Sequence, residues 1–251
     1  CLPYMQEALS SFIAKEIGEE KTLFRLNEFY RSKKVDVILD KKVTRVDFRR
    51  KQVINEDKKA FPFDVLVIAR TDFRLPAIKG SQREGVFRLN RLNDLKELQK
   101  LLPLIETVVV DGNGIFSLQM ACALKKREKE VSVVASSGNV LPALVDSELS
   151  QIVARHLEQN GIRLFLSNSI SEILGEVEVK AIRFTAGKVM AAQAVLMESG
   201  TADLRLFDNS PLKANEGISV NQSFQTNVEN IFAVDEACVS GDGERREDFI
   251  F

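Results

Sequence analysis

The stretch that most constrains the fold is residues 107–124, TVVVDGNGIFSLQMACAL. It opens with a short run of β-branched residues that ends at Asp111, which favours a buried strand. From Ile115 onward the apolar positions change to helical spacing. Gly112 and Gly114 lie between the two patterns. A strand, a glycine turn and a helix in this order are typical of a βαβ unit that binds a dinucleotide.

The glycine turn matches the dinucleotide pattern G-x-G-x-x-G only in part. It reads Gly112-Asn113-Gly114-Ile115-Phe116-Ser117, so a serine stands where the third glycine is expected. In such turns the first glycine makes the tight turn, and the second lets the backbone approach a pyrophosphate at the helix N-terminus. The motif is therefore present but altered.

The elements after the turn continue the alternating pattern. We expect a strand at 131–134, and then a helix capped by Asp146 and closed by Gly161, whose core stripe comprises Leu149, Ile152, Val153 and Leu157. A strand at 162–166 and a small antiparallel meander with a return strand within 177–197 follow. Strands that alternate with helices form a parallel sheet covered by helices. This predicts an α/β fold, with a Rossmann-like domain of residues 103–225 made of a parallel sheet plus a small antiparallel layer.

The segments on either side are expected to form a second domain. Its predicted elements are helices within 1–34 and at 92–102, strands at 35–39, 64–69 and 231–234, and a hairpin at 43–54. For the helix at 92–102 we expect Asn93 as the N-cap and Pro103 as the stop. These strands have few local partners, so the simplest architecture inserts the Rossmann-like domain into an outer α/β domain. That outer domain comprises residues 1–102 plus 226–251.

Composition excludes several classes of function. The net charge of −1 gives no basic surplus for nucleic acid, and no run of 18 apolar residues predicts a membrane span. The three cysteines form no disulfide framework, which suggests a cytoplasmic protein. His156 is the sole histidine, so neither a histidine metal site nor a catalytic triad is expected. We predict no catalytic side chain and no metal ligand.

Four segments in order make the chain resemble the FAD-dependent pyridine nucleotide-disulfide oxidoreductase family. The resemblance is greatest to NADH:rubredoxin reductases and to the flavin part of nitrite reductases. Residues 9–17 resemble the segment after the family's flavin-contacting Arg/Lys-Pro pair, and 63–69 the strand before its Ala-Thr-Gly turn. Residues 107–124 resemble its NAD(P)H turn, and 226–233 the strand before its Gly-Asp flavin signature. The resemblance implies FAD and NAD(P)H as cofactors, an incomplete FAD-binding-type outer domain and an NAD(P)-binding-type inner domain.

The flavin contacts that the resemblance implies are altered. The chain starts after the family's own flavin G-x-G-x-x-G segment, and its end has the look of a shortened chain. Gln6 falls at the Arg/Lys-Pro pair, and Arg70 falls where the Ala-Thr-Gly turn needs small residues. Asp235 and Glu236 fall on the Gly-Asp signature, where Glu236 could still accept a hydrogen bond from a ribityl hydroxyl. FAD binding is therefore expected to be impaired.

The NAD(P)H contacts that the resemblance implies are altered less. Gly112, Asn113, Gly114 and Ile115 form the turn. Asp111 adds a carboxylate at its mouth, and a like-charge pair about 6 Å apart costs roughly 3 kcal/mol at an effective dielectric of about 20.

The contacts at the ribose and nicotinamide ends of the cofactor also differ from the family pattern. Ala135 replaces the acidic residue that would hold the ribose, and Ser136 follows it. Gln119 replaces a glutamate near the nicotinamide, and Gly200 matches the glycine of a second turn. We expect a weak NAD(P)H site.

Three functions are compatible with these residues. The first is an oxidoreductase that passes electrons from NAD(P)H through FAD to an acceptor, weak or inactive by itself because its cofactor sites are degenerate. The second is a non-catalytic binding or assembly module derived from this fold. The third is a piece of a longer enzyme that another chain completes. Each implies a protein electron-transfer partner or a partner subunit, and the first is the interpretation we adopt.

Overall fold

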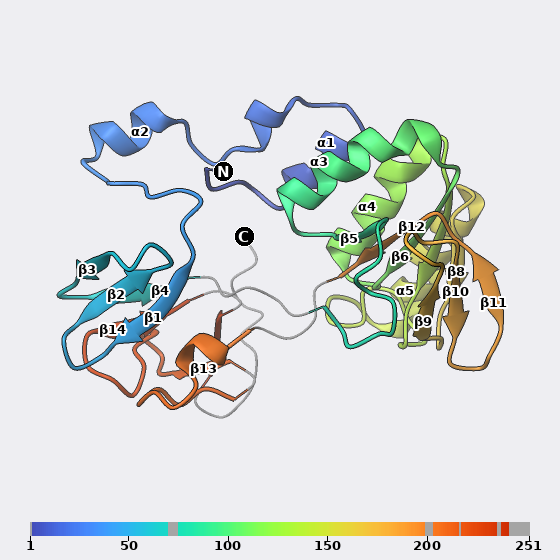
Figure 1. Cartoon of the computed structure of the whole chain (residues 1–251). Coiled ribbons are helices and arrows are strands. Elements are labelled where there is room, and N and C mark those ends of the chain that lie inside the picture. The colour runs from blue at the N-terminus through green and yellow to red at the C-terminus, as the bar shows by residue number, and fades with distance from the viewer. Residues whose placement is uncertain (1, 70–74, 199–202, 216, 235–236, 241–251) are drawn as a thin grey trace. The chain divides into compact units, whose positions relative to one another are not determined.

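The computed structural model describes residues 2–69, 75–198, 203–215, 217–234 and 237–240. These residues fold into two compact units, each assembled from separate stretches of chain. One unit, here called the sheet unit, contains residues 2–36 and 75–198; the other, here called the small unit, contains residues 37–69 and the described residues between 203 and 240. Figure 1 shows the elements of both units in chain order.

A five-stranded parallel sheet forms the centre of the sheet unit, with the order β5-β12-β6-β7-β8. Its strands are β5 (Val86–Arg88), β12 (Ala194–Met197), β6 (Thr107–Asp111), β7 (Glu130–Val134) and β8 (Arg163–Phe165). The three middle strands are almost wholly buried and mostly apolar, as strands covered on both faces must be. The chain moves from β6 outward to β8 and returns to β12, so the strand order reverses between β6 and β12.

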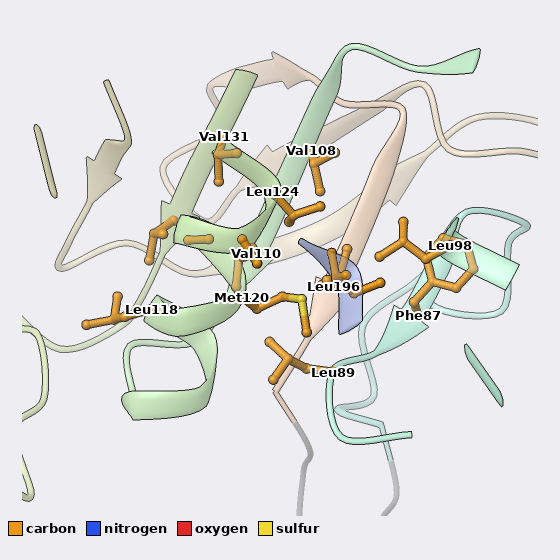
Figure 2. Packing of buried hydrophobic residues seen from close by; sticks show 14 of the residues in the cluster. Phe87, Leu89, Leu98, Val108, Val110, Leu118, Met120, Leu124, Val131 and Leu196 are labelled. Carbon is orange, nitrogen blue, oxygen red and sulfur yellow. The ribbon is translucent and has the colours of Figure 1, made fainter. Parts of the chain in front are cut away.

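Helices cover one face of this sheet. They are α1 (Ala8–Ile13), α3 (Leu92–Leu101), α4 (Ile115–Lys126) and α5 (Ser147–Gln159), and their apolar side chains join those of the sheet in one buried cluster. Figure 2 shows Met120 and Leu124 of α4 next to Val110 and Leu196 on the strands. This packing fixes α4, and with it the turn that precedes α4, against the end of β6.

An antiparallel layer covers the other face. Strands β9 (Ile170–Leu174), β10 (Ala181–Phe184) and β11 (Val189–Ala191) form a three-stranded sheet in the order β11-β10-β9. Its buried side chains pack with Val109, Val195 and Met197 from the opposite face of the parallel sheet. The predicted parallel sheet with a small antiparallel layer is thus confirmed.

The small unit is built from short strands. A hairpin of β1 (Val43–Asp47) and β2 (Gln52–Asn55) continues into β3 (Ala60–Pro62). Two parallel pairs complete it: β4 (Leu66–Ile68) with β14 (Ile231–Ala233), and β13 (Ile218–Val220) with β15 (Cys238–Ser240). They share a core of their own with the short helix η3 (Arg205–Phe207).

Several sequence expectations differ from the structure. Residues 35–39 form no strand, because none of their backbone groups joins a ladder there. Helix α3 begins after Arg91 and not after Asn93, and a 3-10 turn, η2 (Leu102–Leu104), continues through Pro103. On α5, Leu149 and Ile152 are about half exposed, whereas we placed them in a core stripe.

The compact units also divide at residues other than the predicted domain boundaries. Residues 2–36 and 75–102 group with the Rossmann-like sheet and not with the outer domain, since α1 and α3 pack against α4 and β5. Residues 203–215 and 217–225 group with the small unit instead. The remaining elements, η1 (Glu19–Thr22) and α2 (Asn27–Ser32), precede the small unit in the chain.

Candidate functional site

The glycine turn lies at the carboxyl end of β6, beside the point where the strand order reverses. In open α/β sheets such a point is where ligands bind. Gly112 adopts φ +145°, a conformation that other residues rarely adopt, and its N–H donates to the Val134 carbonyl at 2.9 Å. Gly114 is the N-cap of α4 with an extended backbone. The strand, turn and helix predicted from residues 107–124 are therefore present.

Side chains and backbone on both sides hold the turn in place. The Asn113 side-chain amide donates to the Asn139 carbonyl, and the Leu141 N–H donates to the Asn113 carbonyl at 2.9 Å. Ile115 is the first residue of α4 and packs partly buried against the core. The turn is thus anchored to the loop after β7, which leaves the first turn of α4 facing the end of the sheet.

A carboxylate from another strand fills this turn. Glu198 directly follows β12, and its Oε2 accepts a hydrogen bond from the Ser117 hydroxyl at 2.8 Å. The Gly114 N–H lies 3.4 Å from the same oxygen. A β-carbon placed on Gly112 would lie 2.2 Å from Oε2, and one placed on Gly114 would lie 2.5 Å from Oε1. The carboxylate therefore occupies the space that the two glycines leave open.

Asp111 is a second carboxyl group at the same edge. It is the last residue of β6, it pairs in register with Met197 of β12, and its carbonyl accepts from the Glu198 N–H at 2.9 Å. Burial raises the pKa of the Asp111 carboxyl to about 6, and the negative charge of Glu198 adds to this rise. The edge that would face a phosphate thus presents two acidic side chains.

The residues expected near a ribose lie one strand further along. Ala135 follows β7 and is buried, and its N–H donates to the Phe165 carbonyl at 3.2 Å. Ser136 is exposed. Neither side chain provides the charge that would select between a ribose hydroxyl and a phosphate.

A small pocket of the sheet unit brings two other altered positions together. Gln6 and Gln119 both line it, although 112 residues separate them in the sequence. Its remaining lining residues are Leu9, Ser10, Leu89, Asn90, Phe116 and Met120. The pocket is narrow and mostly apolar, and it holds no titratable side chain.

Four predicted positions on the flavin side and at the second turn cannot be placed. Arg70, Gly200, Asp235 and Glu236 lie outside the described residues. We therefore derive no contact to a flavin.

The residue that sequence reasoning missed is Glu198. Its position directly after a predicted strand could have indicated it, because the carboxyl ends of parallel strands meet at one edge of a sheet, where the glycine turn also lies.

Within the described residues, no group of three or more His, Cys, Asp or Glu side chains is placed to hold a metal ion. No helix in those ranges combines the length and the apolar character needed to cross a membrane.

Comparison with known proteins places these observations in a family. A family model described as pyridine nucleotide-disulphide oxidoreductase matches residues 2–244. The chain is 29% identical to an NADH oxidase of Methanocaldococcus jannaschii, over 93% of this chain and 53% of that protein. It is 25% identical to the assimilatory nitrate reductase electron transfer subunit of Bacillus subtilis, over 96% of this chain and 31% of that protein. It is 26% identical to a rubredoxin-NAD(+) reductase of Ectopseudomonas oleovorans, over 95% of this chain and 63% of that protein.

Solved structures agree on the fold. A ferredoxin reductase from Rhodopseudomonas palustris superposes with a TM-score of 0.87 at 22% identity, covering 97% of this chain and 62% of that one. The chain thus spans between about a third and about two thirds of the length of the proteins it matches. The matched family model covers nearly all of the 251 residues, and the predicted resemblance is confirmed. The chain belongs to the pyridine nucleotide-disulphide oxidoreductase family, whose members are NAD(P)H-dependent flavin oxidoreductases.

Proposed function

We propose that this chain is a family member whose NAD(P)H site is degenerate, so that by itself it is weak or inactive in electron transfer from NAD(P)H through flavin to an acceptor. The observation that carries the proposal is the Glu198 carboxylate inside the glycine turn. A dinucleotide pyrophosphate requires the same space and carries the same sign of charge.

Electrostatics supports this proposal. A carboxylate about 4 Å from a phosphate oxygen repels it by about 4 kcal/mol at an effective dielectric of about 20, and solvent reduces the figure. Asp111, at the adjacent edge, adds to the repulsion when it is ionised. A helix N-terminus contributes roughly 0.3–1 kcal/mol to anion binding at an exposed site. The repulsion outweighs this attraction, so the residues present do not fit a tightly bound dinucleotide.

A second candidate function is a binding or assembly module. Large apolar side chains are exposed in each unit: Leu26 and Phe29 in the sheet unit, and Val65, just before β4, and Val67, within β4, in the small unit. Parallel strands are usually covered on both faces, and β4 belongs to a parallel pair. Exposed apolar surface of this kind is typical of protein interaction sites.

The names of the relatives suggest the kind of partner. One relative is called an electron transfer subunit and another a rubredoxin reductase. We therefore propose a protein electron-transfer partner or a partner subunit for this chain as well. Cys122 forms no disulfide among the described residues, which suits a reducing compartment, and we propose the cytoplasm.

The visible spectrum tests whether this chain binds flavin and transfers electrons from NADH by itself. We expect the purified chain to be colourless, and we expect added FAD not to co-elute with it on gel filtration. NADH should then bleach no protein-bound flavin band. A yellow chain whose flavin band is bleached by NADH would contradict the proposal and would assign the oxidoreductase activity to this chain alone.

A further inference from the structure

We propose that Glu198 is a built-in occupant of the phosphate position, and that a dinucleotide binds this chain only when the Glu198 side chain leaves the glycine turn. This inference deepens the proposed function, because it names the residue that controls the same site. On this account the affinity for a dinucleotide is low because one movable side chain fills the turn, and not because the pocket has collapsed.

The donors around Glu198 are those that a phosphate would use. The first turn of an α-helix has backbone N–H groups without partners inside the helix, and an anion satisfies them. Here the Gly114 N–H at the start of α4 points to Glu198 Oε2 at 3.4 Å. The glutamate thus supplies the negative charge that this end of α4 favours.

Ser117 completes the arrangement. It stands where the dinucleotide pattern has its third glycine, it is fully buried, and its hydroxyl donates to Glu198 Oε2 at 2.8 Å. A buried hydroxyl without a partner is costly, so serine at this position needs an acceptor nearby. Ser117 and Glu198 therefore act as a pair. The altered glycine motif and the carboxylate from β12 are two parts of one feature.

Space as well as charge makes the two occupants exclusive. Hypothetical β-carbons on Gly112 and Gly114 would lie 2.2 Å and 2.5 Å from the two carboxylate oxygens. Glycine is required in such turns so that a ligand can approach the backbone closely. That approach is made here by Glu198, so a phosphate oxygen and the carboxylate cannot share the turn.

The backbone of the turn is retained, which is why the site can reopen. Gly112 keeps its N–H bond to Val134, and the Asn113 carbonyl keeps its bond from the Leu141 N–H, neither of which involves Glu198. The side chain of Glu198 is only partly buried. A change of its rotamer therefore suffices to move it into solvent, leaving the glycine turn formed.

The test compares three variants of the full chain by calorimetric titration with inorganic pyrophosphate and with NADH. Glu198→Ala removes the occupant and should strengthen binding of both ligands by at least about tenfold over the wild type. Glu198→Gln keeps the size but removes the charge, and should give a smaller gain. Glu176→Ala removes an exposed carboxylate of the same unit and should leave both affinities unchanged.

If both Glu198 variants are folded and bind neither ligand more strongly than the wild type does, Glu198 is not the occupant that matters, and the inference is overturned. Wild-type binding as strong as that of Glu198→Ala overturns it too. The proposed function fails by a different result, a wild-type chain that carries flavin reducible by NADH, so the two failures are distinguishable.

Discussion

At the scale of residues, the acidic pair Asp111 and Glu198 dominates the chemistry of the site. Asp111 ends β6, Glu198 follows β12, and the two strands pair in parallel register at this edge. Each carboxylate destabilises the other when both are ionised, and only Glu198 has hydrogen-bond donors from the turn. Burial raises the pKa of the Asp111 carboxyl, and the negative charge of Glu198 adds to this rise.

The raised pKa of Asp111 predicts how the free energy of unfolding depends on pH. The pKa of Asp111 is about 6 in the folded chain, above its ordinary value of 3.8. The folded state therefore binds more protons than the unfolded state between these values, and stability is lost as the pH rises from about 4 to about 6. The full loss is on the order of 3 kcal/mol, since each unit of pKa corresponds to about 1.4 kcal/mol.

The variant Asp111→Asn should therefore be more stable than the wild type at pH 8, by about 1–3 kcal/mol. The gain should fall toward zero as the pH is lowered to about 4. Urea unfolding across this pH range measures the difference. The exposed Glu176→Gln variant serves as the control and should show no such trend. A gain that does not depend on pH would show that Asp111 is ionised without cost.

The glycine turn could be predicted from the sequence because its signal is local. A strand, two glycines and a helix lie within 18 adjacent residues, and each leaves its own pattern. Glu198 could not be predicted in the same way. It comes to the turn through the pairing of β12 with β6, which lie more than 80 residues apart in the chain. Strand register at that distance depends on packing that a single sequence does not display.

At the scale of elements, the two ends of α5 are set by residues that lie next to them in the sequence, and not by tertiary packing. The Asp146 carboxylate accepts from the Leu149 N–H at 2.9 Å, which is the predicted N-cap of α5. Gly161 takes φ +76° just after this helix, as a C-terminal glycine should. Both signals lie within the sequence of the helix, and both are confirmed.

The cap gives a second prediction. Asp146→Ala should lower the free energy of unfolding by about 1 kcal/mol, because an N–H of the first turn of α5 loses its acceptor. Gln151→Ala, on the exposed face of the same helix, should change it by less than about 0.5 kcal/mol. Thermal unfolding of the three proteins measures both values. Equal effects of the two substitutions would show that the cap contributes nothing.

Apolar periodicity was less reliable where tertiary packing decides. Leu149 and Ile152 fit a helical stripe of α5 but are about half exposed, whereas Leu157 on the same helix is buried. Residues 35–39 have strand-like composition but form no ladder, because a strand needs a neighbour that supplies backbone partners. In both cases the pattern describes the composition of the segment but does not indicate which other elements pack beside it.

At the scale of the whole molecule, the chain combines a complete parallel sheet with a small unit of short strand pairs. The fold class could be predicted because βαβ order restricts the possible topologies. The extent of the two compact units could not, since α1 and α3 precede the glycine turn in sequence yet pack in the core of the same sheet. Closeness in sequence therefore did not predict which helices share the core of the parallel sheet.

The family and the altered site together define the central claim. The family model of the pyridine nucleotide-disulphide oxidoreductases matches residues 2–244, and the described residues have an α/β fold. At the glycine turn, however, its own carboxylate stands in the place of a phosphate. Both carboxylates sit on the well-packed ends of β6 and β12, so a lost fold does not account for the weak site that we propose.

The most direct test is a calorimetric titration of the wild-type chain with NADH at pH 7.5. Calorimetry is needed because the chain has no tryptophan to report binding. We predict a dissociation constant weaker than about 1 mM, which corresponds to a binding free energy smaller in magnitude than about 4 kcal/mol. A dissociation constant near about 1 μM, close to 8 kcal/mol, would contradict the claim that Glu198 and Asp111 oppose the dinucleotide.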